Sequence, residues 1–189
     1  MVHLTALWLP VLVSAVAVFV VSSLVHMALK IHKSDWAKLP DEDRTLDALR
    51  GAGIPPGMYM FPNCRSQEEM ASPEMTAKFQ RGPVGHMTLL PPGGYAIGKS
   101  LLQWFVLALV VSAGAGYVTG IGLPAGAPKV DVFRATAAVA FIAHGSSGVI
   151  DSIWKGVRWS VAAKFVFDAL LYSLATGAVF AWLWPSGIR

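Results

Sequence analysis

The fold is decided by residues Ala143–Trp184, which read AHGSSGVIDSIWKGVRWSVAAKFVFDALLYSLATGAVFAWLW. This stretch holds two hydrophobic segments joined by the short basic turn 154–159. The histidine and the carboxylate that lie well inside these apolar segments are His144 in the first and Asp168 in the second. Because such groups are costly in lipid, any chemistry within a membrane is expected to involve these two side chains.

The composition extends this membrane character to the whole chain. Of 189 residues, 54% are hydrophobic and 14% are charged, whereas an average soluble domain is about a quarter charged. Four apolar runs are each as long as the ~20 residues that a helix needs to cross a bilayer. The sequence therefore predicts an all-α membrane protein with four transmembrane helices, at about 4–29, 101–123, 132–154 and 161–184.

The positive charges predict the orientation of these spans. Twelve of the fifteen Lys and Arg residues fall in the segment 30–100 or around the turn that joins the last two spans. Positive residues favour the cytoplasmic side, so we expect both termini outside and residues 30–100 in the cytoplasm. This gives three parts: the first helix in 1–29, the cytoplasmic segment 30–100, and the three-helix region 101–189. The expected location is the inner membrane of a bacterial cell.

The cytoplasmic segment is rich in turns and predicts only short elements. Residues 41–50 are typical of a short helix, with acids in the first turn and Arg50 in the last. Ser72 is placed to cap a second helix that has Pro73 in its first turn. Residues 58–61 and 86–90 could pair as a small β-ribbon, because neither run can satisfy its backbone alone.

One stretch matches a nucleotide-binding pattern but lacks its context. Residues 93–100, GGYAIGKS, fit the P-loop pattern GxxxxGK[ST], which requires a buried strand before it and a helix of an α/β domain after it. Here two prolines precede the match and a membrane span follows. We predict no nucleotide binding. Nor do we predict nucleic-acid binding, because the nine basic residues of segment 30–100 face eight acidic ones.

The second span carries small residues at regular spacing. Ser112, Gly116 and Gly120 recur every four positions, and such spacing lets two membrane helices approach closely. We interpret these residues as a helix-packing face.

The third and fourth spans carry polar residues at helical spacing. His144, Ser147 and Asp151 share one face of the third span, and the fourth repeats a polar residue every four positions, at Lys164, Asp168, Tyr172 and Thr176. Because a short turn makes these spans antiparallel neighbours, the two rows should meet as a polar seam between them. At 1.5 Å per residue, His144 should lie level with Tyr172 and within reach of Asp168. Lys164 should neutralise Asp168, and Asp151 should pair with Lys155.

The remaining histidines predict neither a metal site nor a bound cofactor. His26 and His32 lie six positions apart, with Asp35 following; on a continuous helix this spacing points the two rings in different directions. We interpret them as interfacial polar residues. Haem bound by two histidines needs both at one depth, and only His144 lies deep. A single contact from His144 to haem, a pigment or a quinone stays open.

The function expected from these features is non-catalytic. The packing face and the lack of a nucleophile elbow favour a structural or accessory subunit of a membrane protein complex, whose partners are the lipid bilayer and other membrane subunits. The alternative is a small transporter or proton-conducting protein that uses the seam of His144, Asp168 and Tyr172. An enzyme is the least favoured class.

Overall fold

The computed structural model describes residues 1–93 and 96–187, and these are mostly helical. The chain divides into two compact units, one formed by residues 1–36 and 96–189 and the other by residues 37–95. Gly94 and Tyr95 of the P-loop-like match lie outside the described residues. Lys99 and Ser100 of the same match lie exposed in the first turn of a long helix.

Three helices of the described chain are long and apolar enough to cross a membrane. The first covers Leu4–Leu29 and consists of a 3₁₀ turn, α1 (Trp8–Leu24) and a π-helical turn (Val25–Leu29). The others are α5 (Ile97–Gly122) and α7 (Trp159–Leu183). They correspond to three of the four predicted spans, and the protein is a membrane protein by this criterion.

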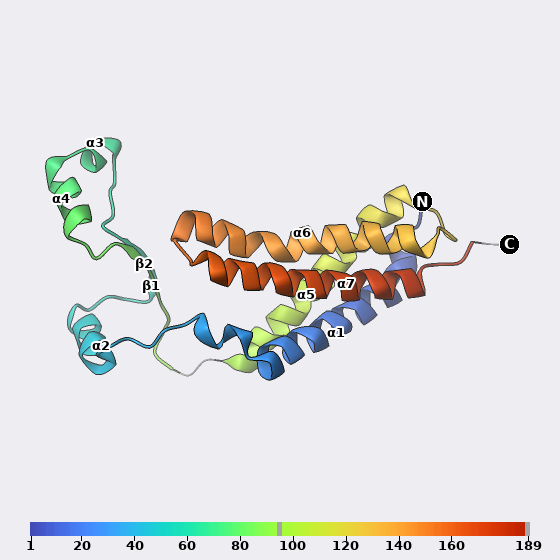
Figure 1. Cartoon of the computed structure of the whole chain (residues 1–189), viewed down its shortest axis with the longest axis horizontal. Coiled ribbons are helices and arrows are strands. Elements are labelled where there is room, and N and C mark those ends of the chain that lie inside the picture. Colours follow the sequence, from blue (N-terminus) through green and yellow to red (C-terminus); the bar gives the residue numbers. More distant parts are fainter. Residues whose placement is uncertain (94–95, 188–189) are drawn as a thin grey trace. The chain divides into compact units, whose positions relative to one another are not determined.

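The fourth predicted span, 132–154, lies in α6 (Lys129–Lys155), which is as long as the others but less apolar. Its sequence places His144, three serines and Asp151 in the second half of the helix, besides charges at both ends. α6 packs along α7 as an antiparallel neighbour, as the short turn predicts (Figure 1). α1 packs against both α5 and α7.

The four long helices bury small and polar residues and expose large apolar ones. Ala15, Ala108, Ala115 and Ala140 are fully buried, and so are the polar residues Ser14, Ser112, Thr136 and Thr176. By contrast, α1 exposes Leu9, Leu12, Val16 and Val20, and α5 exposes Leu102, Val106, Val110 and Val118. Buried large side chains gather in two clusters, one around Leu7 and Phe180 and one around Val18 and Tyr172. Such outward apolar surfaces are typical of helices that contact lipid.

The small residues of α5 lie at a close helix contact. A Cβ added at Gly116 would stand 2.8 Å from the ring of Phe180 on α7. At Gly120 it would stand 2.5 Å from the carbonyl oxygen of Val2, whose amide nitrogen donates a 2.8 Å hydrogen bond to the carbonyl oxygen of Gly120. Ser112 on the same face is buried. Gly116 and Gly120 therefore occupy positions where a larger side chain has no room.

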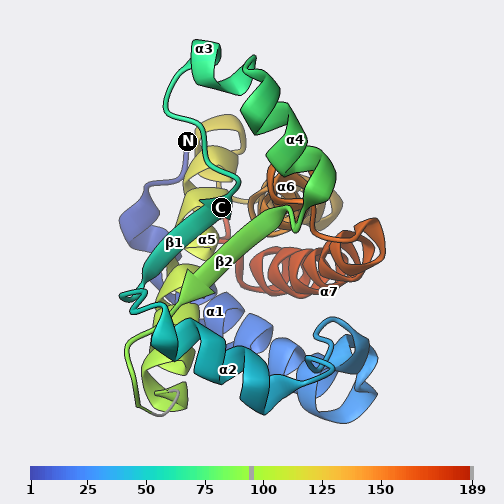
Figure 2. The same ribbon diagram turned by 90° about the vertical axis from the view of Figure 1, so that its left-hand side faces the viewer.

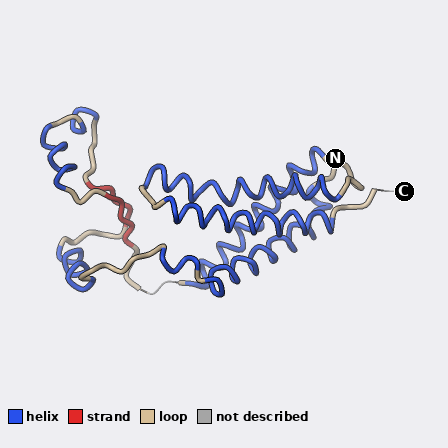
Figure 3. The backbone as a smooth tube through the Cα atoms, in the orientation of Figure 1, coloured by secondary structure: helices blue, strands red, loops and turns tan. Residues whose placement is uncertain are grey.

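The unit of residues 37–95 contains the predicted short elements. α2 (Glu42–Gly51) is capped by the side chain of Asp41, and α4 (Pro73–Arg81) by that of Ser72. β1 (Gly57–Phe61) pairs antiparallel with β2 (Gly85–Leu89) (Figures 2 and 3). The predicted ribbon is thus confirmed: β1 begins one residue earlier than predicted, and β2 begins and ends one residue earlier. An additional short helix, α3 (Gln67–Met70), was not expected from the sequence.

Candidate functional site

The chain turns sharply just after α1, and this turn creates the site. The π-helical turn ends at Leu29, and Lys30 adopts a left-handed backbone conformation with φ of 54°. A 3₁₀ turn (Ile31–Ser34) then follows. Left-handed backbone is uncommon for a residue with a Cβ, so the reversal is specified by the surrounding contacts. π-helical turns are also frequent at functional sites.

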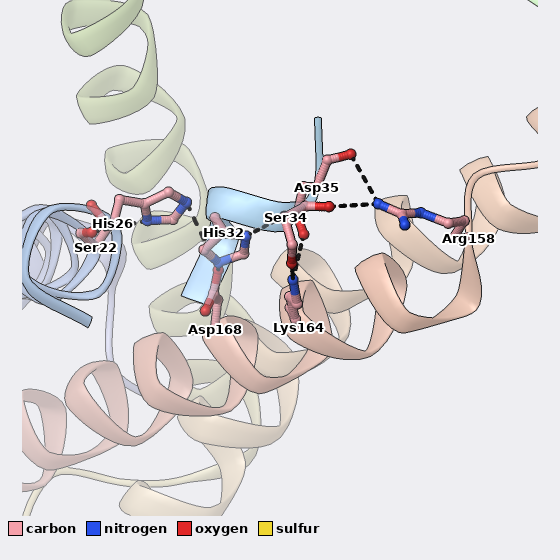
Figure 4. A network of polar contacts seen from close by, with 8 residues as sticks. All are labelled: Ser22, His26, His32, Ser34, Asp35, Arg158, Lys164 and Asp168. Carbon is pink, nitrogen blue, oxygen red and sulfur yellow. Dashed lines mark hydrogen bonds and ion pairs between the residues drawn. The ribbon is translucent and has the colours of Figure 1, made fainter. Parts of the chain in front are cut away.

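The reversal brings His26 and His32 together. Their imidazole rings are stacked, with centroids 4.4 Å apart and an interplanar angle of 1° (Figure 4). The prediction that the two rings point in different directions is therefore wrong, because it assumed that the helix continues through Lys30. His26 remains partly exposed, whereas His32 is largely covered.

Asp168 of α7 faces both histidines. Its Oδ2 accepts a hydrogen bond from Nε2 of His32 at 2.9 Å and lies 3.9 Å from Nε2 of His26. The residue is 1% exposed, and its other oxygen, Oδ1, has no hydrogen-bond partner among the described residues. The predicted partners of Asp168 were His144 and Lys164; the structure instead joins it to the turn after α1.

A second carboxylate, that of Asp35, lies on the other side of His32. Its Oδ2 lies 2.6 Å from Nδ1 of His32, and its Oδ1 accepts a 2.6 Å bond from Nζ of Lys164. Lys164 also donates to the hydroxyl of Ser34, and Arg158 donates to the backbone carbonyls of Ser34 and Asp35 (Figure 4). Two cations, one immediately before α7 and one in its second turn, therefore hold the turn after α1 in place.

The ring of His32 bridges the carboxylates of Asp35 and Asp168, and this limits which of the three groups can carry protons. A neutral imidazole carries one N–H and can donate to only one of them. Both contacts are satisfied when the ring is an imidazolium or when one carboxyl group is protonated. Burial raises the pKa of Asp35, but its hydrogen bonds with Lys164 and His32 outweigh burial and hold that pKa below its usual value. Lys164 and His32 therefore both favour the ionised form of Asp35.

His144 lies in a separate aromatic cluster. Its ring centroid is 5.5 Å from that of Tyr172 and 5.8 Å from that of Trp104. Trp104 in turn donates through Nε1 to the hydroxyl of Ser22, at 2.9 Å. The predicted match in depth between His144 and Tyr172 thus agrees with the structure. His144 is the residue at which a haem, pigment or quinone contact stayed open, and here it packs against two aromatic rings.

The other residues of the predicted seam are dispersed. Ser147 is exposed, and Asp151 pairs with Lys155 at 2.7 Å, as expected from their spacing. Thr176 is buried and donates to the backbone carbonyl of Tyr172 on its own helix. The seam is therefore not one continuous row of contacts between α6 and α7.

Sequence reasoning did not assign His26, His32, Asp35 and Arg158 to a site. What the sequence reasoning lacked was the position at which the first helix ends, at Lys30. A cationic residue directly after a long apolar run is a signal for such an end, because Lys and Arg are common in the last turn of a helix. The sequence does not show, however, that the chain reverses so tightly that two histidines six positions apart become neighbours.

Comparison with known proteins finds no relative of this chain. No protein-family model matches the chain, and neither a curated protein nor a solved structure matches it.

Proposed function

We propose that the chain is a multi-pass protein of the cell inner membrane, in which α6 crosses beside α5, α7 and the Leu4–Leu29 helix. At 1.5 Å per residue, the 27 residues of α6 extend over about 40 Å, enough to cross ~30 Å of hydrocarbon. Its contact with α7 along the helix supports this, because the second helix shields part of its polar surface.

In this arrangement both termini face outward and residues 30–100 lie in the cytoplasm, as the distribution of Lys and Arg favours. The single cysteine, Cys64, offers a native probe of this orientation. A membrane-impermeant maleimide should label Cys64 only after the cells are permeabilised. In the double variant His3→Cys, Cys64→Ser, the cysteine at position 3 should be labelled in spheroplasts that remain intact.

Labelling in denatured membranes measures the intrinsic reactivity of each thiol and serves as the control. Equal labelling of Cys64 before and after permeabilisation would place residues 30–100 outside and contradict the proposal.

We further propose that the protein is a structural or accessory subunit of a membrane protein complex. The observation that carries this proposal is the unpartnered apolar surface of α1 and α5, on which large side chains stand exposed at helical spacing. On the Leu4–Leu29 helix the surface includes a shallow hollow lined by Phe19, Val20, Ser23, Leu24, Met27 and Ala28. A neighbouring transmembrane helix fits such a surface as well as lipid does.

Extraction in a mild detergent followed by mass spectrometry tests the subunit proposal. The protein should be recovered with other membrane proteins in a fixed ratio that survives a second affinity step. Recovery of the chain alone, as a monomer or a homodimer, would contradict the proposal.

The second candidate is a small transporter or proton-conducting protein. It is favoured by the buried carboxylate of Asp168, which His32 connects to Asp35 near the end of the candidate spans. The dispersed seam of His144, Ser147 and Thr176 argues against a continuous path through the helices. In reconstituted vesicles, Asp168→Asn should abolish a proton or solute flux at unchanged protein content; an unchanged flux would remove this candidate.

A further inference from the structure

We propose that His26, His32 and Asp168 form a binding site for one divalent transition-metal ion, with Zn²⁺ as the representative ion. The potential ligand atoms of the three residues all lie within 4.8 Å of one another. Nε2 of each histidine points to the same oxygen, Oδ2 of Asp168, at 2.9 Å from His32 and 3.9 Å from His26. The site goes beyond the proposed subunit role and does not depend on it.

The Nδ1 atoms of both histidines already face hydrogen-bond acceptors. Nδ1 of His26 lies 3.0 Å from the backbone carbonyl oxygen of Ser22, and Nδ1 of His32 lies 2.6 Å from the carboxylate of Asp35. When each Nδ1 carries the proton, the lone pair of each ring is on Nε2. Histidine ligands of metals are almost always oriented in this way, by an acceptor that takes the other N–H. The two rings are thus arranged as ligands.

The carboxylate of Asp168 supplies an independent indication. Oδ1 is buried and has no partner among the described residues, and the whole residue is 1% exposed. An ionised carboxylate removed from water needs a compensating charge. Oδ2 faces Nε2 of both His26 and His32, and a divalent cation bound between them would supply that charge.

The ligand types select the class of ion. Two imidazole nitrogens and one carboxylate oxygen suit Zn²⁺ and its neighbours in the first transition row. Mg²⁺ and Ca²⁺ prefer sites made of oxygen atoms. Three protein ligands leave a fourth tetrahedral position for water or another small ligand.

Binding requires a modest change in the histidine rings. The rings are parallel in this structure, with an interplanar angle of 1°, whereas an ion shared by both Nε2 atoms must lie in the plane of each ring. One ring must therefore turn. His26, with a side chain 45% exposed, has the room to do so. The ion would also fasten the turn after α1 to α7, in place of the hydrogen bond between His32 and Asp168.

Zn²⁺ binding by the full-length protein tests the proposal. The chain is purified in detergent without a polyhistidine tag and stripped with a chelator, and Zn²⁺ is added in isothermal titration calorimetry. One ion should bind per chain with saturation. His26→Ala, His32→Ala and Asp168→Asn should each weaken binding at least about tenfold, and Asp35→Asn about 10- to 100-fold through loss of the orienting contact.

Matched variants separate this site from other zinc-binding groups. His86→Ala removes an exposed histidine of β2, and Asp151→Asn removes an acid of α6; both should bind as the wild type does. Circular dichroism and gel filtration identify any variant that fails to fold, and the partly exposed His26 keeps the test valid if Asp168→Asn is one of these.

Replacing Zn²⁺ with Co²⁺ adds a direct readout of the ligands. Tetrahedral Co²⁺ absorbs visible light, so the wild type should become coloured and folded His26→Ala should not. Failure of the wild type to bind Zn²⁺ with saturation, or equal binding by His26→Ala and the wild type, would overturn the proposal.

Discussion

At the scale of single residues, the clearest constraint is the contact between Gly120 and the N-terminal segment. A Cβ at this position would meet a backbone oxygen, which cannot move as the end of a side chain can. Gly120→Ala should therefore displace Val2 and weaken the hydrogen bond between the two backbones. We expect a loss of about 1–3 kcal/mol in the free energy of unfolding, measured by thermal or denaturant unfolding in detergent.

Gly114→Ala is the matched control, because it lies on the same helix and an added Cβ would meet nothing within 4 Å. Ala is favoured over Gly in a helix by up to about 1 kcal/mol, so this variant should be neutral or stabilising. Equal effects of the two substitutions would show that the contact at Gly120 does not limit the size of the side chain.

The pair Glu74 and Lys78 on α4 gives a prediction about pH. The hydrogen bond and charge of Lys78 hold the pKa of Glu74 below its ordinary value of 4.5. Because the folded-state pKa is lowered, the contribution of Glu74 to stability is present above the unfolded-state pKa and is lost as pH falls through the folded-state pKa. Lys78→Met should raise the pKa of Glu74 towards 4.5, as measured by NMR of the labelled carboxyl carbon. An unchanged pKa would show that the pair does not form in solution.

At the scale of the elements, the left-handed turn at Lys30 joins the first candidate span to the site. This conformation costs roughly 1–2 kcal/mol for a residue with a Cβ, and glycine avoids that cost. Lys30→Gly should therefore keep the fold and raise the free energy of unfolding by up to about 1 kcal/mol, whereas Lys30→Val should lower it.

Lys33→Val is the control, since it changes the same side chain in the adjacent 3₁₀ turn without a left-handed backbone. A loss in Lys33→Val as large as that in Lys30→Val would attribute the effect to the lost charge rather than to the backbone.

The elements themselves were largely predictable from the sequence. Local signals placed the cap at Ser72, the helix after Asp41 and the two strands of the ribbon, because each depends on residues a few positions apart. The long helices begin up to four residues before the predicted spans, since hydropathy detects the apolar centre of a helix rather than its first turn. α3 was missed because one helical turn has no measurable periodicity.

The candidate site was less predictable, for a reason of geometry. Depth along a helix follows from a fixed rise per residue, and it correctly paired His144 with Tyr172. The partner of Asp168 depends instead on how α1 lies against α7 and on the reversal at Lys30, both of which are tertiary features. A rule based on spacing within one helix cannot supply them.

At the scale of the whole molecule, the long helices expose large apolar side chains and bury small or polar ones. The contact between α6 and α7 is the most extensive of the long helices, and a Cβ at Gly177 of α7 would stand 2.9 Å from the backbone oxygen of Phe133 on α6. Gly177→Leu should therefore separate the two helices. After alkaline carbonate extraction, we expect a smaller fraction of the Gly177→Leu variant to stay in the membranes than of the Gly114→Leu variant. Gly114 is the control because a Cβ there would meet nothing within 4 Å.

The close contact between α6 and α7 also bears on how the protein is made. A segment with His144, three serines and Asp151 partitions poorly into hydrocarbon by itself, so in a four-span arrangement α6 would have to wait at the translocation channel for α7. The two would then leave the channel laterally as a pre-paired hairpin. At roughly 5–20 residues synthesised per second, the whole of α7 follows the end of α6 within about 1–6 seconds, and this short delay makes such joint release feasible.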